Sequence, residues 1–169
     1  MAKIIYVTSD TFFGRSSLAK ARGFSSSEEM DAVLIKEWND KVKPDDIVWH
    51  LGNFAWDIIA GENALHQLNG KINLVQSELD EGLTEIYQIQ NIPLFKGYVI
   101  IKSLNIVMSH WPMYDWPAKY ENNSMHIHGG DKEYRAQLNI ENRFNVNCEL
   151  WSLHPVSINA LNETKDMVK

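Results

Sequence analysis

The sequence predicts an α/β fold in which strands and helices alternate through the first half of the chain. Three short runs, at 4–7, 47–51 and 71–75, are rich in apolar and β-branched residues, as buried strands are. Apolar residues at helical spacing separate the first two runs. A change from helical to strand periodicity within a few residues is typical of a βαβ unit.

The first long helix is predicted over residues 27–42. Ser26 and Glu29 have the spacing of a capping box, and Pro44 ends the helical pattern. The apolar residues at helical spacing are Met30, Val33, Leu34, Trp38 and Val42. A less regular helix around 64–68 ends at Asn69 and Gly70, a common C-terminal signal.

The second half of the sequence predicts further strands and one helix. Runs at 97–102 and 104–108 flank a short turn and predict a hairpin. Two more strands are expected around 125–128 and 144–148, with Cys148 at the edge of the core. A final helix is expected after Pro155, with Ser157 as its N-cap.

Composition limits the organisation and the functional classes. With 169 residues and 44% hydrophobic content, the chain predicts a single domain over 1–169. No apolar run is as long as a membrane span, and no secretion signal is recognisable, so we expect no membrane association and a soluble, cytoplasmic protein. A net charge of −6 with 16 basic residues disfavours nucleic acid as a partner.

Polar motifs follow the predicted strands at the edge where α/β proteins build their sites. In chain order they are Ser9-Asp10-Thr11-Phe12-Phe13-Gly14-Arg15, His50-Leu51-Gly52-Asn53-Phe54-Ala55, Ser77-Glu78-Leu79-Asp80, Ser109-His110-Trp111-Pro112 and His126-Ile127-His128-Gly129-Gly130. Together they resemble the motifs of the calcineurin-like metallophosphoesterases, in compact single-domain form. The resemblance spans almost the whole chain and implies a sandwich of two mixed β-sheets flanked by helices.

The resemblance implies a site for two divalent ions, but most ligand positions are changed. Two such ions about 4 Å apart repel by on the order of 16 kcal/mol at an effective dielectric of 20, and a bridging carboxylate offsets that repulsion. Asn53 occupies the bridging position, and its carboxamide offers only one neutral oxygen. Asp10 and His110 keep the family's residues. The remaining changed positions are Phe12, Glu78, Leu79, Gly130 and Lys132.

These changes predict a vestigial site made of Asp10, Asn53, Glu78, Asp80, His110 and His128, with no catalytic residue and no metal cofactor. One alternative is a rewired site for Mn or Zn. Its ligands would be Asp10, His110, His126 and His128, with Asp80 or Asp131 as further candidates.

Two basic residues suggest other roles for the altered site. Lys132 stands at a former ligand position, where an ammonium could pair with Asp10 in place of a metal. Arg15 and Lys132 could instead hold a nucleotide or another phosphate compound without hydrolysis.

The segment 111–117 is rich in aromatic residues and is bracketed by proline. Trp111, Met113, Tyr114 and Trp116 form a predicted partner-binding surface, since aromatic residues and Met are enriched at interfaces. Packing within the fold is the alternative interpretation. This segment and the altered ligands predict a catalytically inactive protein that binds a protein partner. Binding of a phosphate compound and a rewired phosphoesterase are the alternatives.

Overall fold

The computed structural model describes residues 3–117, 124–133 and 142–166. The first of its two sheets has the strand order β4-β3-β2-β1-β9. Its strands are β1 (Ile5–Thr8), β2 (Ile47–His50), β3 (Lys71–Val75), β4 (Leu94–Phe95) and β9 (Val156–Ser157). The first four strands run parallel, and β9 is antiparallel to β1, so the sheet is mixed.

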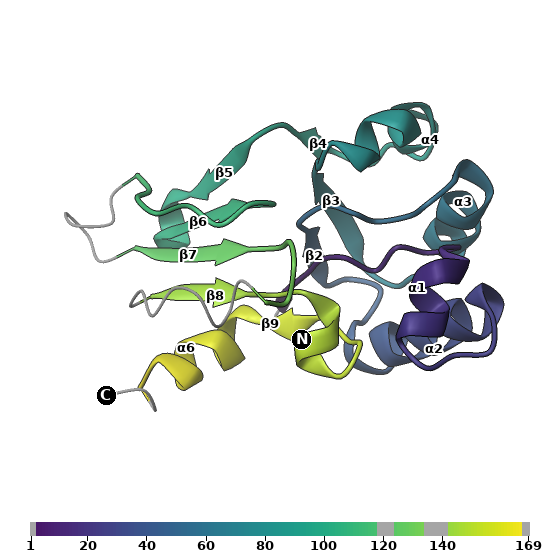
Figure 1. Cartoon of the computed structure of the whole chain (residues 1–169). Helices are drawn as coiled ribbons and strands as arrows, with labels where there is room; N and C mark the ends of the chain where they lie inside the picture. Colours follow the sequence, from purple (N-terminus) through teal and green to yellow (C-terminus); the bar gives the residue numbers. More distant parts are fainter. Residues whose placement is uncertain (1–2, 118–123, 134–141, 167–169) are drawn as a thin grey trace.

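The second sheet has the order β5-β6-β7-β8 and lies beside the first (Figure 1). Its strands are β5 (Tyr98–Ile101), β6 (Ile106–Ser109), β7 (Met125–His128) and β8 (Arg143–Asn145). The β5–β6 pair is antiparallel, which confirms the predicted hairpin, and β6, β7 and β8 are parallel. This sheet is therefore mixed as well.

Helices lie beside both sheets, with α1 to α4 gathered on one side of the first sheet and α6 next to β9 (Figure 1). The α-helices are α1 (Ser16–Ala21), α2 (Ser27–Lys41), α3 (Ile58–Gln67), α4 (Thr84–Ile89) and α6 (Ile158–Asp166). The 3-10 helices are η1 (Leu79–Leu83), η2 (Lys102–Leu104) and η3 (Cys148–Trp151). Two mixed sheets flanked by helices confirm the predicted α/β sandwich. In the described residues, no helix has the length and apolar character needed to cross a membrane.

Local signals located the main helices because caps and periodicity act over a few residues. The Ser26 Oγ accepts the Glu29 N–H at 3.2 Å, which starts α2 as predicted. Ser157 likewise caps α6 by accepting the Ala160 N–H at 3.2 Å. One strand boundary was wrong: β8 ends at Asn145, because Cys148 already begins η3. Cys148 is fully buried, and burial raises the pKa of its thiol to about 12.

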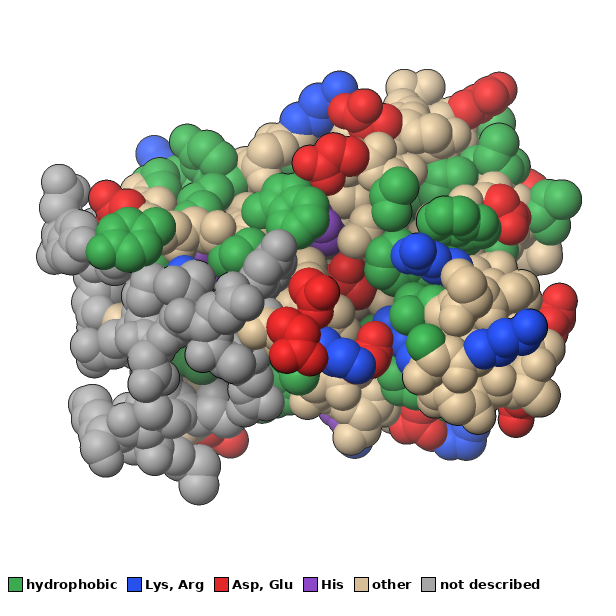
Figure 2. Space-filling view, in the orientation of Figure 1, with side chains coloured by type: hydrophobic (Ala, Val, Ile, Leu, Met, Phe, Trp, Pro, Cys, Tyr) green, Lys and Arg blue, Asp and Glu red, His purple; other side chains and the backbone are tan. Residues whose placement is uncertain are grey.

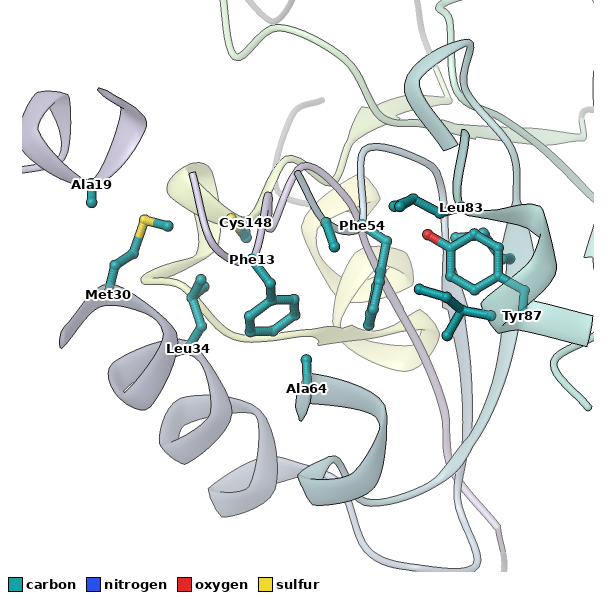
Figure 3. Close-up of a cluster of buried hydrophobic side chains, with 12 residues drawn as sticks. Phe13, Ala19, Met30, Leu34, Phe54, Ala64, Leu83, Tyr87 and Cys148 are labelled. Atoms are coloured by element: carbon teal, nitrogen blue, oxygen red, sulfur yellow. The ribbon is translucent and has the colours of Figure 1, made fainter. Parts of the chain in front are cut away.

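The hydrophobic core has two main parts. One lies between the helices and the first sheet, where Phe13, Leu34, Phe54 and Tyr87 pack together (Figure 3). The other joins the two sheets; its buried members include Val7, Leu51, Val75, Met108 and Ile127. Packing on both faces explains why β6 and β7 are buried at every position.

The sheets bring the carboxyl ends of several strands to one place. Thr8 of β1 lies opposite His50 of β2, and Ser109 of β6 lies opposite His128 of β7. An isolated bridge between Ser9 and Asn147 ties the end of β1 to the second sheet. The motifs that follow these strands therefore meet where the sheets join.

Candidate functional site

Asp10, Asn53 and His110 are brought together at the carboxyl ends of β1, β2 and β6. Asp10 and Asn53 adopt left-handed backbone conformations, with φ of 60° and 58°, which Asp and Asn tolerate better than most residues. Phe12 also has a positive φ, 52°, and a bulky residue there is a true outlier. Strained backbone of this kind is concentrated at functional sites.

The Asn53 carboxamide lies between Asp10 and His110. Its Nδ2 donates to Asp10 Oδ1 at 2.8 Å and lies 3.4 Å from His110 Nε2. Its Oδ1 is 2.7 Å from the Ser77 hydroxyl, which donates to it. The amide nitrogen thus points its N–H groups toward Asp10 and His110, the two residues that keep the family's identity.

His110 is oriented to present an acceptor to that amide. The His110 Nδ1 lies 2.6 Å from the Leu51 carbonyl oxygen, to which only a protonated Nδ1 can donate. In the neutral ring, Nε2 then carries a lone pair that faces the Asn53 amide. The Asn53 amide therefore stabilises the Asp10 carboxylate and the His110 lone pair by hydrogen bonding, as a bound cation would stabilise them by its charge.

Asp10 is held by the second sheet as well as by Asn53. Its Oδ2 accepts the Gly130 N–H at 2.9 Å, and its side chain is buried. Burial raises the pKa of the Asp10 carboxyl, and the hydrogen bonds from Asn53 and Gly130 partly oppose this increase. Asp10 thus joins the first sheet to the connection after β7.

Lys132 does not pair with Asp10, so that expectation was wrong. The Lys132 Nζ lies 2.6 Å from Glu149 Oε2, and nearly half of the lysine side chain is exposed. Arg22 approaches Asp10 instead, but through the backbone. Its guanidinium donates to the carbonyl oxygens of Asp10 at 2.7 Å and Thr11 at 3.0 Å, and its Nε pairs with Glu149 at 3.1 Å.

Asp80 has a structural role beside the site. Its carboxylate accepts the backbone N–H groups of Asn53 at 2.8 Å, Phe54 at 3.0 Å and Ser77 at 2.9 Å. The Tyr87 hydroxyl lies 3.3 Å from Asp80 Oδ1. Asp80 therefore fixes the Asn53 backbone rather than facing the cavity.

Glu78 and Leu79 lie outside this network. The exposed Glu78 carboxylate accepts the Trp111 indole N–H at 3.1 Å. Its pKa is lowered, first by a hydrogen bond from its own backbone N–H and then by Trp111. Leu79 is 48% exposed and has no polar group to offer a reacting molecule.

The residues present do not fit the dinuclear metal centre that the family resemblance implies. Asn53 directs an N–H toward Asp10, where a bridging carboxylate would direct an oxygen toward an ion. Across residues 3–117, 124–133 and 142–166, no three His, Cys, Asp or Glu side chains are placed to hold one ion. The donor set thus lacks the bridge and the ligand number that such a centre requires.

The two histidines proposed for a rewired site are buried on β7. The Nε2 of His126 accepts the Met113 N–H at 3.0 Å, and its Nδ1 lies 3.3 Å from the Val107 carbonyl oxygen. Both ring nitrogens of His126 are therefore engaged. His128 Nδ1 donates to the Gly129 carbonyl oxygen at 2.8 Å. Burial lowers the pKa of His126 to about 3 and of His128 to about 4, so both rings are neutral at pH 7.

A cavity of about 420 Å³ opens beside the Asn53 network. Its lining includes Asp10, Arg15, Asn53, Trp111, Lys132 and Glu149. The structure thus brings Arg15 and Lys132 to one cavity, as the phosphate alternative requires. Glu149 nevertheless already neutralises Lys132, which leaves Arg15 as the better placed cation.

The aromatic segment 111–117 divides into exposed and buried residues. Tyr114 is 77% exposed and Trp111 is 47% exposed, whereas Met113 is partly buried. Trp116 is only 4% exposed, so its predicted role as a surface contact was wrong. Its indole N–H donates to the Ser124 hydroxyl at 2.9 Å, and its ring lies 5.1 Å from that of His126. Trp116 packs this segment onto β7 and leaves Trp111 and Tyr114 on the surface.

Sequence reasoning missed Ser77, Arg22 and Trp56. Ser77 follows β3 in a motif of which only the other three residues were assigned roles. Its hydroxyl nevertheless orients the Asn53 amide. Arg22 lies in no recognisable motif. Trp56 directly follows the motif that ends at Ala55, and its ring stacks on Arg15 with 4.5 Å between guanidinium carbon and ring centre. A tryptophan directly after a site motif was the signal available in the sequence.

Asp31 supports the site loop from α2. Its carboxylate accepts the Gly14 N–H, with oxygens at 2.9 and 3.1 Å. Burial raises its pKa from 3.8 to about 6; the hydrogen bond from Gly14 opposes this, and Glu28 and Asp57 add to it. The folded protein therefore binds a proton that the unfolded chain has released. This favours folding at low pH, and the contribution is lost as pH rises through about 6.

Replacing Asp31 by Asn is expected to raise the free energy of unfolding by about 1 kcal/mol at pH 8, after allowance for solvent screening. The amide removes the charge and keeps an acceptor for Gly14. Near pH 4 the two proteins should converge, because Asp31 is then protonated as well. Urea unfolding at both pH values measures the difference, with Asp40→Asn on the exposed face of α2 as control. A benefit of Asp31→Asn that does not change with pH would contradict the assigned titration.

Comparisons with known proteins agree with the fold. No protein-family model matches the chain. The uncharacterized protein MJ1445 of Methanocaldococcus jannaschii is 29% identical over 167 residues, covering 93% of this chain and 88% of that protein.

Two solved structures are similar. A protein of unknown function from Aquifex aeolicus, AQ665, matches with a TM-score of 0.75 and 21% identity over 96% of this chain and 100% of that chain, so the two share their fold. The nuclease MPE of Pseudomonas putida matches at a TM-score of 0.46 and 14% identity, over 74% of this chain and 59% of that chain. A likeness that weak says nothing about function.

Proposed function

We propose that this chain is a metallophosphoesterase-like protein that lacks the two-metal chemistry and works by binding, with another protein as its partner. The observation that carries the proposal is the Asn53 amide between Asp10 and His110. A carboxamide donates where the two-metal reaction needs a carboxylate bridge. A cytoplasmic location belongs to the same proposal.

The second support is the loss of groups that would assist a reaction. Leu79 stands at the position where the resemblance places a histidine that helps the leaving group, and Leu cannot transfer a proton. Phe12 likewise cannot ligate. Binding needs none of these groups, whereas hydrolysis of a phosphoester by two metals needs them together.

The cavity favours a second candidate function, the binding of a nucleotide or another phosphate compound. A volume of about 420 Å³ lies within the usual range for small-molecule sites, and Arg15 is on its wall. Ligand-induced stabilisation distinguishes this candidate, because a compound that binds the folded state raises the melting temperature by mass action.

The test compares melting and turnover with and without divalent ions. We expect melting curves in Mn²⁺ and in chelator to coincide, since a bound ion would stabilise the folded state. No phosphodiesterase turnover is expected with Mn²⁺ or Zn²⁺. The positive control combines Phe12→His, Asn53→Asp, Glu78→Asn, Leu79→His, Gly130→His and Lys132→His. Wild-type turnover that His110→Ala abolishes would overturn the proposal.

A further inference from the structure

An exposed apolar surface lies beside the cavity, where the loop after β1 meets the loop after β2 and the first turn of α3. We call it the Trp56 surface and define it by Phe12, Arg15, Trp56, Ile58 and Ile59. Trp56 is 52% exposed, Ile58 49% and Ile59 73%, so three large apolar side chains within four residues face solvent. Figure 2 shows hydrophobic side chains gathered over the side of the molecule where α3 lies, with basic side chains beside them. A cluster of this kind is typical of an interaction site.

The loop after β1 is joined by hydrogen bonds to the segment that leads into α3. The Trp56 N–H donates to the Phe13 carbonyl oxygen at 2.8 Å, next to a bridge between Phe13 and Ala55. Gly14 has a φ of +83°, and a Cβ there would meet the Ala60 Cβ at 2.5 Å. The glycine therefore permits both the turn and the close packing on α3. The exposed side chains are thus held on a fixed backbone.

Arg15 is the central residue of this surface. Its guanidinium carbon lies 4.7 Å from the centre of the Phe12 ring and 4.5 Å from the centre of the Trp56 ring. Stacking of this kind fixes the cation before any ligand arrives.

Within the part of the chain that the structure describes, Arg15 has no carboxylate partner, whereas its neighbouring cations do. Its Nε is buried without a hydrogen-bond partner among the described residues. Arg22 and Lys132 both pair with Glu149. Two carboxylates that lie beside the neighbouring Gly14 are engaged as well, since Asp31 accepts from Gly14 and Asp57 caps α3 through Ala60. No described carboxylate balances the charge of Arg15, so the outer nitrogens of its guanidinium are suited to an acceptor from outside the chain.

We propose that the Trp56 surface binds a protein segment that presents one Asp or Glu between aliphatic or aromatic side chains. Arg15 receives the carboxylate, and Trp56, Ile58 and Ile59 receive the apolar side chains. Tryptophan and arginine are the residues most enriched among interface residues that dominate binding energy. The inference rests on the proposed function, because it names the surface through which a protein partner is bound.

The charges of this protein favour a partner segment with a single acidic residue over one with a longer acidic run. The chain carries a net charge of −6, which repels a strongly acidic partner. Of the three cations that the structure describes around this surface and cavity, Arg15 alone has no carboxylate partner. A single carboxylate from the partner is therefore enough to neutralise it. A small phosphate ligand is less suited, because phosphate sites gather several donors and the side chains of the neighbouring Ile58 and Ile59 offer none.

The test uses a random peptide library displayed on phage, selected on wild-type protein. We expect enriched peptides to carry one Asp or Glu within an apolar sequence. Synthetic copies are then titrated by calorimetry, and Arg15→Met or Ile59→Ser should each weaken binding at least tenfold. The matched controls are Lys20→Met, an exposed cation on α1, and Ile89→Ser, an exposed apolar residue on α4; both should change binding less than twofold.

A double-mutant cycle identifies the carboxylate contact. Changing the peptide's Glu to Gln should weaken binding to wild-type protein and have little effect on binding to the Arg15→Met variant. Peptides without an acidic residue, binding insensitive to Arg15 and Ile59, or no enriched peptide would overturn the inference. So would displacement of the peptides by inorganic phosphate. Peptides that depend on Tyr114 would overturn it and leave the proposed function standing, whereas metal-dependent turnover would overturn the proposed function itself.

Discussion

Asn53→Asp is expected to lower the free energy of unfolding by about 3 to 4 kcal/mol at pH 7.5 in the presence of chelator. The change removes the amide donor 2.8 Å from Asp10 Oδ1 and places a second carboxylate there. Two unit charges 4 Å apart repel by about 4 kcal/mol at an effective dielectric of 20. Urea unfolding measures the loss.

The pH dependence of that loss separates repulsion from the missing hydrogen bond. Two carboxylates that share a site have one strongly raised pKa, so the variant should regain stability as pH falls toward 5. Asn53→Ala is the control, because it removes the amide without adding charge and should show no such recovery. Mn²⁺ should stabilise the Asn53→Asp variant and leave the wild type unchanged. Wild-type stability of Asn53→Asp at pH 7.5 in chelator would contradict the role given to the amide.

Trp116→Ala is expected to cost about 3 to 5 kcal/mol of stability, the usual range for removing a large buried aromatic side chain. Trp116 is 4% exposed, donates to Ser124 and packs its ring against that of His126. Its loss opens a void between the aromatic segment and β7.

Tyr114→Ala provides the comparison, because Tyr114 is 77% exposed and its removal should change stability by less than about 0.5 kcal/mol. Chemical denaturation of both variants tests the division of the segment into packing and surface residues. Equal effects of the two substitutions would contradict it.

Features that depend on neighbouring residues were predictable from the sequence. The start of α2 at Ser27 follows from the Ser26 cap, and its buried face from apolar residues at helical spacing. The polar motifs after β1, β2 and β6 were expected at one edge because parallel strands end together. Asp10, Asn53 and His110 meet there.

Contacts between distant segments were not predictable in the same way. The two-residue strands β4 and β9 have too few residues to produce a pattern. Lys132 was expected near Asp10, yet Glu149 is the carboxylate that lies within its reach. Trp116 and Tyr114 look alike in sequence, and only the position of β7 makes one of them buried. Asn53 was interpreted as a poor ligand; its action as a donor depends on Ser77, which comes from another strand end.

The position of the Asn53 amide also bears on how easily such a protein could return to catalysis. If the chain descends from a metal-dependent enzyme, a single change of Asn53 to Asp would first produce a less stable protein, because the new carboxylate would repel Asp10. Activity would not return with it, because Phe12 and Leu79 would still provide no ligand and no acid. Regain of activity would need several substitutions at once, each of little benefit alone. Replacement of the metal centre by this hydrogen-bonded site is therefore hard to reverse by single substitutions. Among proteins that have lost the metal centre in this way, we expect surface residues to diversify rather than catalytic chemistry.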